Sequence, residues 1–406
     1  MSKKLLFISK DNLTTNPRLL KELKFAVSLG YDVDFVGFSF DNWSDKIDKE
    51  IITKINANFE YISAYRKPLF IWFFSSIIEK LAQKLFFIFP KSLIIAAFAH
   101  SKRSFLLNRN LKKKKKYDLI IAHNLPALFP AYKFSKKHKT PFIFDIEDYH
   151  PGEAVSEKKE IERRKFLFKN ILPKADFITY ASPLIGKFSL DLLKGSKMPD
   201  NKLINNCFSE KEFKHVENNT EKLKFVWFSQ NIDYGRGLEI FIPIFYNFKD
   251  EISLALIGNL RDGFSKEILN KYDDFIEIIP PLTQTELNLQ VSEFDIGLAI
   301  EPGKDFNNEI ALSNKIFSYA QAGLFILATN TQAQNKFISE HPDLGILTRS
   351  EINDIANKLR IIIKEKEQIR SKKEERFNYS KKLSWEIESK KLEKIWTQIF
   401  TNKKTS

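Results

Sequence analysis

The polar residues that separate two apolar runs in the segment 296–329 have the types and the order needed to bind an anion. The first run, 296–300, leads into a polar loop, and 313–323 then reads as a short helix before the next apolar run. Ser313 can cap this helix, and Lys315 lies in its first turn. A lysine beside the positive end of a helix dipole suits an external anion as partner. The segment therefore predicts a diphosphate site.

A second group of polar residues lies at the ends of apolar runs in the first half of the chain. His123 ends one run, Asp148 and His150 follow another, and Asn16 and Arg18 stand at the start of a predicted helix. Because the reference pKa of histidine is about 6.5, His150 could orient or deprotonate a hydroxyl. A capping or core-edge histidine is the alternative. For His123 a structural or cleft-lining role is favoured, and Asn16 has a sufficient role as an N-cap.

Three common signatures are missing from the sequence. No Gly-x-Gly-x-x-Gly follows the first apolar run, no Walker-type Gly-Lys-Ser/Thr is present, and no cysteines and histidines have metal-ligand spacing. Dehydrogenases and P-loop enzymes are therefore poor matches. We expect no metal site and no cofactor.

Short apolar runs alternate with helical stretches along the chain, which is typical of βαβ units and predicts parallel sheets. In the first half, strands are predicted at 5–9, 32–38, 117–122, 141–145 and 176–181. The rhythm restarts in the second half, with strands predicted at 224–228, 253–257, 276–279, 295–300 and 324–329. The predicted fold class is α/β, with two Rossmann-like, doubly wound domains.

Gly195, Pro199 and nearby polar residues predict the boundary between these domains. We expect a first domain over 1–198 and a second over 199–383. The segment 384–406 reads as an amphipathic helix with a polar tail, which should pack on one of the domains.

Size, charge and cysteine content narrow the class of protein. A chain of 406 residues suggests two domains, and a formal charge of +14 favours anionic partners without choosing among them. Cys207 is the single cysteine, and the first apolar run is too short for a signal peptide. We therefore expect a cytoplasmic protein.

The segment 64–116 combines aromatic runs with lysines and ends in five consecutive lysines. Its longest uncharged stretch, 68–78, is far shorter than the roughly 20 residues that span a bilayer. One reading is a helix at an anionic membrane surface, which would make the protein peripheral at the inner face of the membrane. The other is an ordinary helical insertion on the first domain with a solvated lysine run.

The sequence Asn314-Lys315-Ile-Phe-Ser-Tyr-Ala-Gln-Ala-Gly323 resembles the Asn-Lys-(apolar)2-Glu-Tyr-x-x-x-Gly segment of the family 4 (group 1) glycosyltransferases. Weaker matches follow the same order and span nearly the whole chain: Asn16-Pro17-Arg18, His123, the segment 145–150, Asn206, Gly235-Arg236-Gly237, Gly258 and Ser384-Trp385-Glu386. The resemblance implies the GT-B architecture, in which two Rossmann-like domains face a cleft.

The chain departs from the family pattern at two places. The second glutamate of the family pair corresponds to Ser318, and one of the two phosphate-binding cations corresponds to Gln230, while Arg236 retains the other. Glu301 and Glu309 have the family's spacing of seven intervening residues. Glu309 aligns with the first family glutamate one residue out of register, which leaves the ribose contact open.

The resemblance implies a role for each matching position. The implied catalytic residues are Glu309, Arg236, Lys315 and His150. The implied donor-binding residues are Ser229, Gln230, Arg236, Gly258, Glu301, Glu309, Ser313, Asn314 and Lys315. The implied acceptor-side residues are Asn16, Arg18, His123, Asp148 and His150. Surface ion pairs or solvated side chains are the alternative for the charged members of this set.

The function implied is transfer of a sugar from a nucleotide sugar to a glycan or lipid-linked acceptor hydroxyl, with retention and without a metal. We expect a bacterial surface-polysaccharide or lipid-linked glycan pathway and no nucleic-acid partner. Three alternatives stay open: an epimerase or phosphorylase of the same fold, a non-catalytic basic protein that binds membranes or nucleic acid, and a glycosyltransferase that has lost activity.

Overall fold

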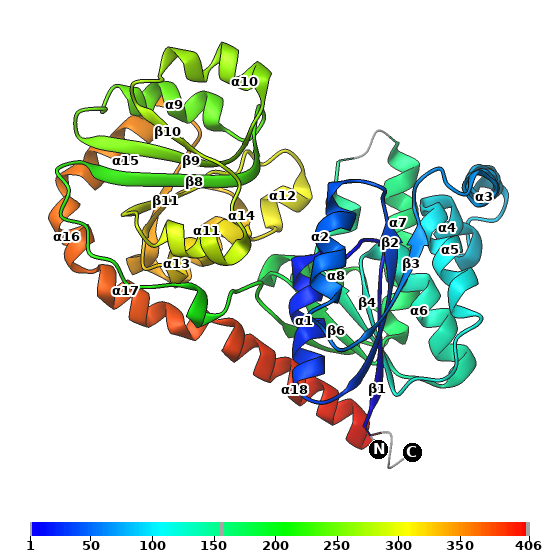
Figure 1. The fold of residues 1–406 in the computed structure, drawn as a ribbon. Helices are drawn as coiled ribbons and strands as arrows, with labels where there is room; N and C mark the ends of the chain where they lie inside the picture. Colours follow the sequence, from blue (N-terminus) through cyan, green and yellow to red (C-terminus); the bar gives the residue numbers. More distant parts are fainter. Residues whose placement is uncertain (1, 155–156, 403–406) are drawn as a thin grey trace. The chain divides into compact units, whose positions relative to one another are not determined.

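The computed structural model describes residues 2–154 and 157–402, which form two parallel sheets (Figure 1). The chain divides into a first unit, with residues up to Ile204 and from Lys391, and a second unit, Asn205–Lys390. The predicted boundary at 198/199 lies earlier than this division. The difference arises because Asp200–Leu203 forms an edge strand of the first sheet.

The first sheet has seven parallel strands in the order β3-β2-β1-β4-β5-β6-β7. Its strands are β1 (Lys4–Ser9), β2 (Asp32–Ser39), β3 (Asn58–Ser63), β4 (Leu119–His123), β5 (Phe142–Ile146), β6 (Phe177–Tyr180) and β7 (Asp200–Leu203). The central strands β1, β4 and β5 are almost entirely buried, as expected of a sheet covered on both faces.

The helices of the first unit include three from the segment 64–116, which is helical as predicted. They are α1 (Pro17–Ser28), α2 (Trp43–Ile52), α3 (Leu69–Ile88), α4 (Leu93–His100), α5 (Lys102–Leu111), α6 (Leu125–His138), α7 (Lys158–Ile171) and α8 (Pro183–Asp191), with short 3-10 turns η1 (His150–Gly152) and η2 (Leu172–Lys174). Helices α1 and α2 lie on one side of the sheet, and α4 to α7 on the other (Figure 1).

The second sheet has six parallel strands in the order β10-β9-β8-β11-β12-β13. Its strands are β8 (Leu223–Ile232), β9 (Ile252–Leu260), β10 (Ile276–Ile279), β11 (Ile296–Ala299), β12 (Phe325–Thr329) and β13 (Gly345–Thr348). The remaining helices are α9 (Leu238–Tyr246), α10 (Asp262–Glu267), α11 (Gln284–Val291), α12 (Phe306–Ile310), α13 (Asn314–Gln321), α14 (Gln332–Glu340), α15 (Ile352–Lys364), α16 (Lys366–Ser371), α17 (Lys373–Ser380) and α18 (Trp385–Asn402), with 3-10 turns η3 (Glu210–Glu212), η4 (Leu269–Lys271), η5 (Pro342–Leu344) and η6 (Lys381–Leu383).

Alternate residues of β8 in the second sheet pack into two separate hydrophobic cores, one on each face of the sheet. Phe225 and Trp227 of β8 pack with α9 and α15, whereas Val226 between them packs with α13 and α14. Both faces of the strand are therefore buried, which explains why it reads as a continuous apolar run rather than an alternating one.

The amphipathic C-terminal segment forms α18, and the division between the units falls within this helix. Its second half packs on the first unit, where Trp396 contacts the rings of Phe25 and Tyr31. Its first turn is tied to the second unit, since Glu386 accepts a hydrogen bond from Ser209.

Each sheet has one point at which the order of its strands reverses. In the first sheet this switch point lies between β1 and β4, and in the second between β8 and β11. Ligands of open α/β sheets bind beside the carboxyl ends of the strands at such a point. The loops that follow these four strands are therefore the places to look for a site.

Candidate functional site

An ion pair stands at the switch point of the second sheet. Glu301 follows β11, and its backbone N–H donates to Thr329 Oγ1 at 2.9 Å. Lys315 lies in the first turn of α13, where Ser313 is the N-cap and accepts a hydrogen bond from the Lys315 N–H. Lys315 Nζ donates to Glu301 Oε1 at 2.8 Å. The structure thus joins two predicted donor-binding residues.

The charges of this pair stabilise each other. Burial alone would raise the pKa of Glu301, but Lys315, Ser313 and Arg236 outweigh it and lower that pKa below its usual value. Glu301 is therefore ionised at neutral pH. The side chains of Lys315 and Glu301 are 11% and 22% exposed, so the pair is largely buried but still reaches solvent.

A glycine turn after β8 carries Arg236 to the same place. Gly237 has φ +85°, and a Cβ on it would lie 2.5 Å from Ile300 Cγ2, so the turn packs directly on the end of β11. Glu239 in the first turn of α9 accepts a hydrogen bond from the Gly235 N–H at 2.8 Å. Arg236 is exposed and, within the described residues, makes no hydrogen bond or ion pair.

Lys304 is a second cation at this turn, and sequence reasoning missed it. A Cβ placed on Gly235 would lie 2.8 Å from Lys304 Nζ, which puts the ammonium over the glycine turn. Lys304 is also exposed and has no anionic partner among the residues that the structure describes. Its only signal in the sequence is its place in the loop Glu-Pro-Gly-Lys, which does not reveal a contact with a turn about 70 residues earlier.

Glu309 and Asn314 lie beside this group, each with its own partner. Glu309 Oε2 accepts a hydrogen bond from the Gln332 N–H at 3.4 Å, at the start of α14. The other carboxylate oxygen of Glu309 lies over Gly303, where a Cβ would approach it to 2.2 Å. Asn314 Oδ1 accepts from Asn206 Nδ2 at 2.7 Å. No contact given by the structure joins Glu309 to Lys315.

The predicted residues of β8 and β9 lie at an irregularity between these strands. The register of β8 against β9 shifts between Phe228 and Asn231, so Ser229 and Gln230 sit in the bulge. Gly258 permits it, because a Cβ there would lie 2.1 Å from the Ser229 carbonyl oxygen. Gln230 is exposed at this edge.

Ser318 points into the protein. It is fully buried in α13, and its hydroxyl donates to Asn288 Oδ1 of α11 at 2.9 Å. A ligand cannot reach this position in the structure, so Glu301 and Glu309 are the carboxylates of this loop cluster that remain available for hydroxyl groups.

In the first unit, Arg18 is part of a buried ion pair. Arg18 Nε and Nη2 donate to the two carboxylate oxygens of Asp145 at 2.6 and 2.7 Å, and Nη1 donates to the Ile204 carbonyl at 2.6 Å. Only 3% of Arg18 is exposed. The structure therefore gives the predicted acceptor-side arginine an internal role, linking α1 to β5 and to the end of β7.

His123 is fully buried among three carboxylates. Its Nδ1 lies 2.7 Å from Glu147 Oε1 and 3.4 Å from Asp145 Oδ2, and its Nε2 lies 3.5 Å from Glu22 Oε2. Burial lowers the pKa of His123, but these carboxylates outweigh it and raise the pKa well above its usual value. His123 is therefore an imidazolium at neutral pH, held inside the first unit by these carboxylates.

Glu22, His123 and Asp145 also have ligand atoms within 4.8 Å of one another, the one such group found among the described residues. Arg18 already binds both oxygens of Asp145, and His123 carries a positive charge. Because metal ligands must be deprotonated, this donor set fits an internal ion-pair network better than a metal site.

Asn16 and Glu147 line the switch point of the first sheet. Asn16 caps α1, since its Oδ1 accepts from the Leu19 N–H, and its Nδ2 donates to Glu147 Oε1 at 2.7 Å. Asn124, which has φ +67°, donates to the other oxygen of Glu147 and accepts from Ser9. Glu147 and Asn124 are members of this array that the sequence pattern did not indicate.

His150 has partners on both ring nitrogens. Its Nε2 accepts from the Leu125 N–H at 3.2 Å, and its Nδ1 lies 3.0 Å from Glu153 Oε1. This arrangement fits the tautomer with a proton on Nδ1. His150 is 4% exposed, and Asp148 is half-buried two residues before it. His150 would have to exchange a partner before it could accept a proton from an acceptor hydroxyl.

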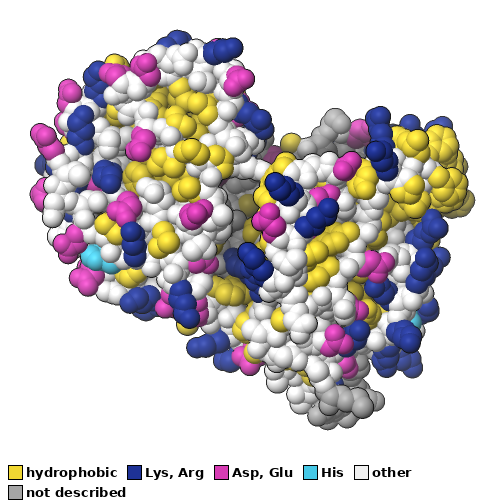
Figure 2. Space-filling view, viewed as in Figure 1, with side chains coloured by type: hydrophobic (Ala, Val, Ile, Leu, Met, Phe, Trp, Pro, Cys, Tyr) yellow, Lys and Arg dark blue, Asp and Glu magenta, His cyan; other side chains and the backbone are white. Residues whose placement is uncertain are grey.

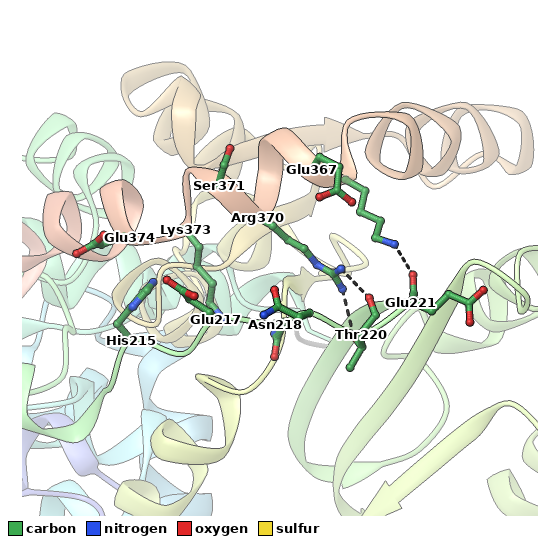
Figure 3. A pocket seen from close by; sticks show the side chains of 12 residues that line it. His215, Glu217, Asn218, Thr220, Glu221, Glu367, Arg370, Ser371, Lys373 and Glu374 are labelled. Carbon is green, nitrogen blue, oxygen red and sulfur yellow. Dashed lines mark hydrogen bonds between the residues drawn. The ribbon is translucent and has the colours of Figure 1, made fainter.

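The second unit also has a hollow of about 560 Å³ between the segment 215–221 and the helices α16 and α17 (Figure 3). Arg370 and Lys366 reach across it to the Thr220 and Glu221 carbonyls. These residues precede β8, so the hollow lies at the amino-terminal edge of the sheet. Burial lowers the pKa of Lys373 to about 8, although its Nζ donates to the Ser292 and Phe294 carbonyls. These contacts tie the helices to the sheet.

Known structures with a similar fold were found, although the sequence itself has no match. No family model and no curated protein matches the sequence. Sucrose-phosphate synthase from Thermosynechococcus elongatus superposes with a TM-score of 0.68 at 14% identity, covering 98% of this chain and 100% of that one. Anabaena HepE, solved with UDP and glucose, gives a TM-score of 0.68 at 13% identity over 98% and 100% of the two chains.

A protein from Listeria monocytogenes named for UDP-N-acetylglucosamine 2-epimerase activity is also similar, with a TM-score of 0.58 at 9% identity over 92% of this chain and 91% of that one. The predicted α/β fold with two Rossmann-like domains, as found in GT-B proteins, is confirmed by these likenesses and by the two parallel sheets.

Proposed function

We propose that this protein is a glycosyltransferase that binds a nucleotide-sugar donor at the switch point of its second sheet. The observation that carries the proposal is the pair of exposed cations at this point, Arg236 and Lys304, neither of which forms a hydrogen bond or a close ion pair with a carboxylate in the described chain. Arg236 is near enough to Glu301 to lower the pKa of that carboxyl, which places the cation beside the Glu301–Lys315 pair. Exposed cations beside a glycine turn and a helix N-terminus suit a diphosphate. The fold supports it, because Anabaena HepE was solved with UDP in a protein of the same fold.

In this proposal one of the two phosphate-binding cations of the family pattern is retained as Arg236, and the other is supplied from a different position. Gln230 stands where one family cation is expected, and Lys304 brings an ammonium to the same glycine turn from the loop after β11. Lys315 is already neutralised by Glu301 at 2.8 Å. We therefore assign the diphosphate charge to Arg236 and Lys304, and donor hydroxyl groups to the Glu301–Lys315 pair.

The proposed reaction follows from the charge that develops on the leaving group. The bond between the sugar C1 and the β-phosphate oxygen breaks while the acceptor oxygen bonds C1 from the same face, and the acceptor proton passes to the leaving phosphate. Arg236 and Lys304 stabilise the negative charge of that phosphate, which is the largest demand of an oxocarbenium-like transition state. No metal is required for this charge stabilisation, and the configuration at C1 is retained.

Epimerisation of a nucleotide sugar is the second candidate, favoured by the likeness to the Listeria protein. It would use the same donor site without an acceptor. Transfer would release a nucleoside diphosphate only in step with a new glycosidic bond, whereas an epimerase would isomerise the sugar in the absence of acceptor.

The test uses the full chain with UDP-, GDP- and ADP-sugars, each with and without short-chain polyprenyl-phosphate-sugar and free-glycan acceptors. Nucleoside diphosphate release and mass spectrometry of the acceptor report transfer, and proton NMR of the donor reports isomerisation. We expect transfer that is lost in Arg236→Ala and kept in Lys336→Ala, a control in an exposed ion pair of α14. Isomerised donor without acceptor would replace the proposal with epimerisation. A parallel incubation of the glycan with inorganic phosphate tests phosphorolysis, and release of a sugar phosphate there would replace the proposal with that reaction.

A further inference from the structure

Helix α3 exposes many of its large apolar side chains, whereas a surface helix of a globular protein usually buries them. The two buried residues of α3, Ser75 and Ala82, are small. Trp72, Ile78 and Phe86 are partly buried, and the ring of Phe86 contacts that of Phe166. Glu79 accepts a hydrogen bond from the Lys102 N–H, and Gln83 donates to the Ala99 carbonyl. Because its polar side is bound to the protein, α3 cannot turn its apolar side inward without breaking these contacts.

Most of the large apolar side chains of α3 are exposed. Phe70, Phe73, Phe74, Ile77, Leu81 and Ile88 are all exposed and recur at intervals of three, four or seven residues. We call them the aromatic surface. Phe70 and Phe73 are 73% and 62% exposed, and Figure 2 shows the hydrophobic side chains gathered at this end of the first unit. Isolated exposed apolar residues are ordinary, whereas a contiguous patch marks a contact site.

The surroundings of the aromatic surface are strongly basic. The segment 64–116 contains thirteen lysines and arginines and a single acidic residue, Glu79, in a chain whose net charge is +14. Lys80 and Lys84 are exposed on α3 itself. Lys102 lies 4.8 Å from the ring of Trp72, and Lys159 lies 3.9 Å from that of Phe87.

We propose that the aromatic surface and its lysines dock this protein onto the surface of an anionic lipid bilayer. Apolar side chains would enter the interface while lysines reach the headgroups, which is how basic amphipathic helices bind lipid. Within the described part of the chain, no helix is both long and apolar enough to cross a membrane. Helix α3 would therefore lie in the plane of the interface. This inference does not depend on the donor site.

A second copy of the chain is a poorer occupant. A two-fold contact would place the same surface of both copies together. Each copy would bring the same excess of lysines and arginines, and like charges across an interface are unfavourable. An anionic bilayer supplies the opposite charge and an apolar layer at once.

The experiment is flotation of the full chain with vesicles of phosphatidylcholine alone or with about 30% phosphatidylglycerol. We expect binding to the anionic vesicles only, weakened at least tenfold by Phe70→Ser with Phe73→Ser, and likewise by Lys80→Glu with Lys84→Glu. These side chains are exposed, so thermal unfolding and donor binding should stay unchanged.

Matched controls lie on the second unit. Ile352→Ser with Ile361→Ser removes exposed apolar groups of α15, and Lys364→Glu with Lys372→Glu makes the same change in net charge. Both should bind vesicles like the original chain. Three results would overturn the proposal: no binding to anionic vesicles, equal weakening by the controls, or a dimer in analytical ultracentrifugation that Phe70→Ser with Phe73→Ser converts to monomer.

Discussion

Charged side chains of this protein fall into two groups according to what neutralises them. Arg18 and His123 are buried and bound by carboxylates of the same unit. Arg236 and Lys304 are exposed beside a glycine turn without such partners in the described residues. Burying a charge is costly unless it is paired, so the first group serves stability, whereas exposed cations remain available to a ligand.

The first group gives a prediction for His123→Gln. The change removes an imidazolium that faces Glu22, Asp145 and Glu147, leaving buried carboxylates less compensated, so the first unit should lose about 3–5 kcal/mol. Hydrogen exchange of β4 peptides in increasing urea measures this loss. His341→Gln in the second unit is the control and should cost less than about 1 kcal/mol. A similarly small loss for His123→Gln would show that the histidine is uncharged.

Ser318 gives a second prediction, because the family resemblance places a glutamate there. A carboxylate at this buried position would face Asn288 Oδ1, so Ser318→Glu should destabilise the second unit by on the order of 3 kcal/mol or more. Ser318→Ala should cost about 1 kcal/mol, since it removes one hydrogen bond to Asn288 Oδ1, which still accepts from Gln284 Nε2. Urea unfolding followed by exchange of α13 peptides compares them. A stable Ser318→Glu variant with tighter donor binding would mean that this position contacts the ligand.

Some residues of the site could be predicted from the sequence. Others could not, because their contacts join residues that are far apart in the sequence. Ser313, Lys315 and Glu301 were found because they belong to one strand-loop-helix segment, where local spacing determines which groups meet. Lys304 and Glu147 were missed because their partners lie far away in the sequence. The family resemblance places Arg18 on the acceptor side, and only the packed structure shows that Asp145 binds its guanidinium.

At the scale of elements, the glycine turn between β8 and α9 sets the position of Arg236. Gly237 needs φ +85° and lies against Ile300, so the turn can be built only with a residue that has no side chain. The turn therefore fixes one cation relative to the end of β11, where Glu301 begins the second loop of the site.

Gly237→Ala should cost the second unit about 1–3 kcal/mol and weaken donor binding as well, because both the backbone angle and the contact with Ile300 must change. Gly30→Ala is the matched control. Gly30 has φ +80°, and a Cβ added there would meet no atom within 4 Å, so only the backbone penalty of about 1 kcal/mol applies. Thermal unfolding and donor titration of both variants provide the measurements. Equal stability losses and unchanged donor binding would contradict this account of the turn.

Most strands were predictable and three were not. The predicted strands read as apolar runs because both faces of the sheets are covered. The missed strands β3, β7 and β13 are all at sheet edges, and their burial is incomplete. A half-exposed strand such as Asp-Asn-Lys-Leu carries no apolar signal, so tertiary pairing alone determines it.

At the scale of the whole molecule, the repeated βα rhythm predicted two units. Because strand β7 was not predicted, the predicted boundary lies before this strand, whereas β7 belongs to the first unit. The two units share a parallel α/β fold but differ in the charged side chains at their switch points. The first holds a network of ionised side chains at its switch point, and the second holds the exposed cations.

Lowering the pH should destabilise the first unit, because it protonates Glu160. Burial would raise the pKa of Glu160, but His100 and Arg163 outweigh it and lower that pKa to about 2. A lowered carboxyl pKa contributes stability above the unfolded value near 4.5, and this contribution disappears as pH falls toward 2. Glu160→Gln should therefore cost about 1–3 kcal/mol at pH 7 and almost nothing near pH 2.

Urea unfolding of the first unit at several pH values measures this difference. Glu162→Gln is the control, because Glu162 is 60% exposed and its ion pair with Lys165 is long, at 3.5 Å. Its cost should be small at every pH. A Glu160→Gln cost that does not change between pH 7 and pH 2 would contradict the assignment of an ionised, stabilising carboxylate.

The most direct test of the central claim is calorimetric titration of UDP-, GDP- and ADP-sugars against the full chain, Arg236→Ala, Lys304→Ala and the control Lys336→Ala. We predict saturable binding of one donor class, weakened about tenfold or more by each of the first two substitutions and unchanged by the third, because each charged hydrogen bond to a phosphate contributes about 1.5–3 kcal/mol. Absence of binding to every nucleotide sugar, or binding that neither Arg236→Ala nor Lys304→Ala weakens, would contradict a donor site at this switch point.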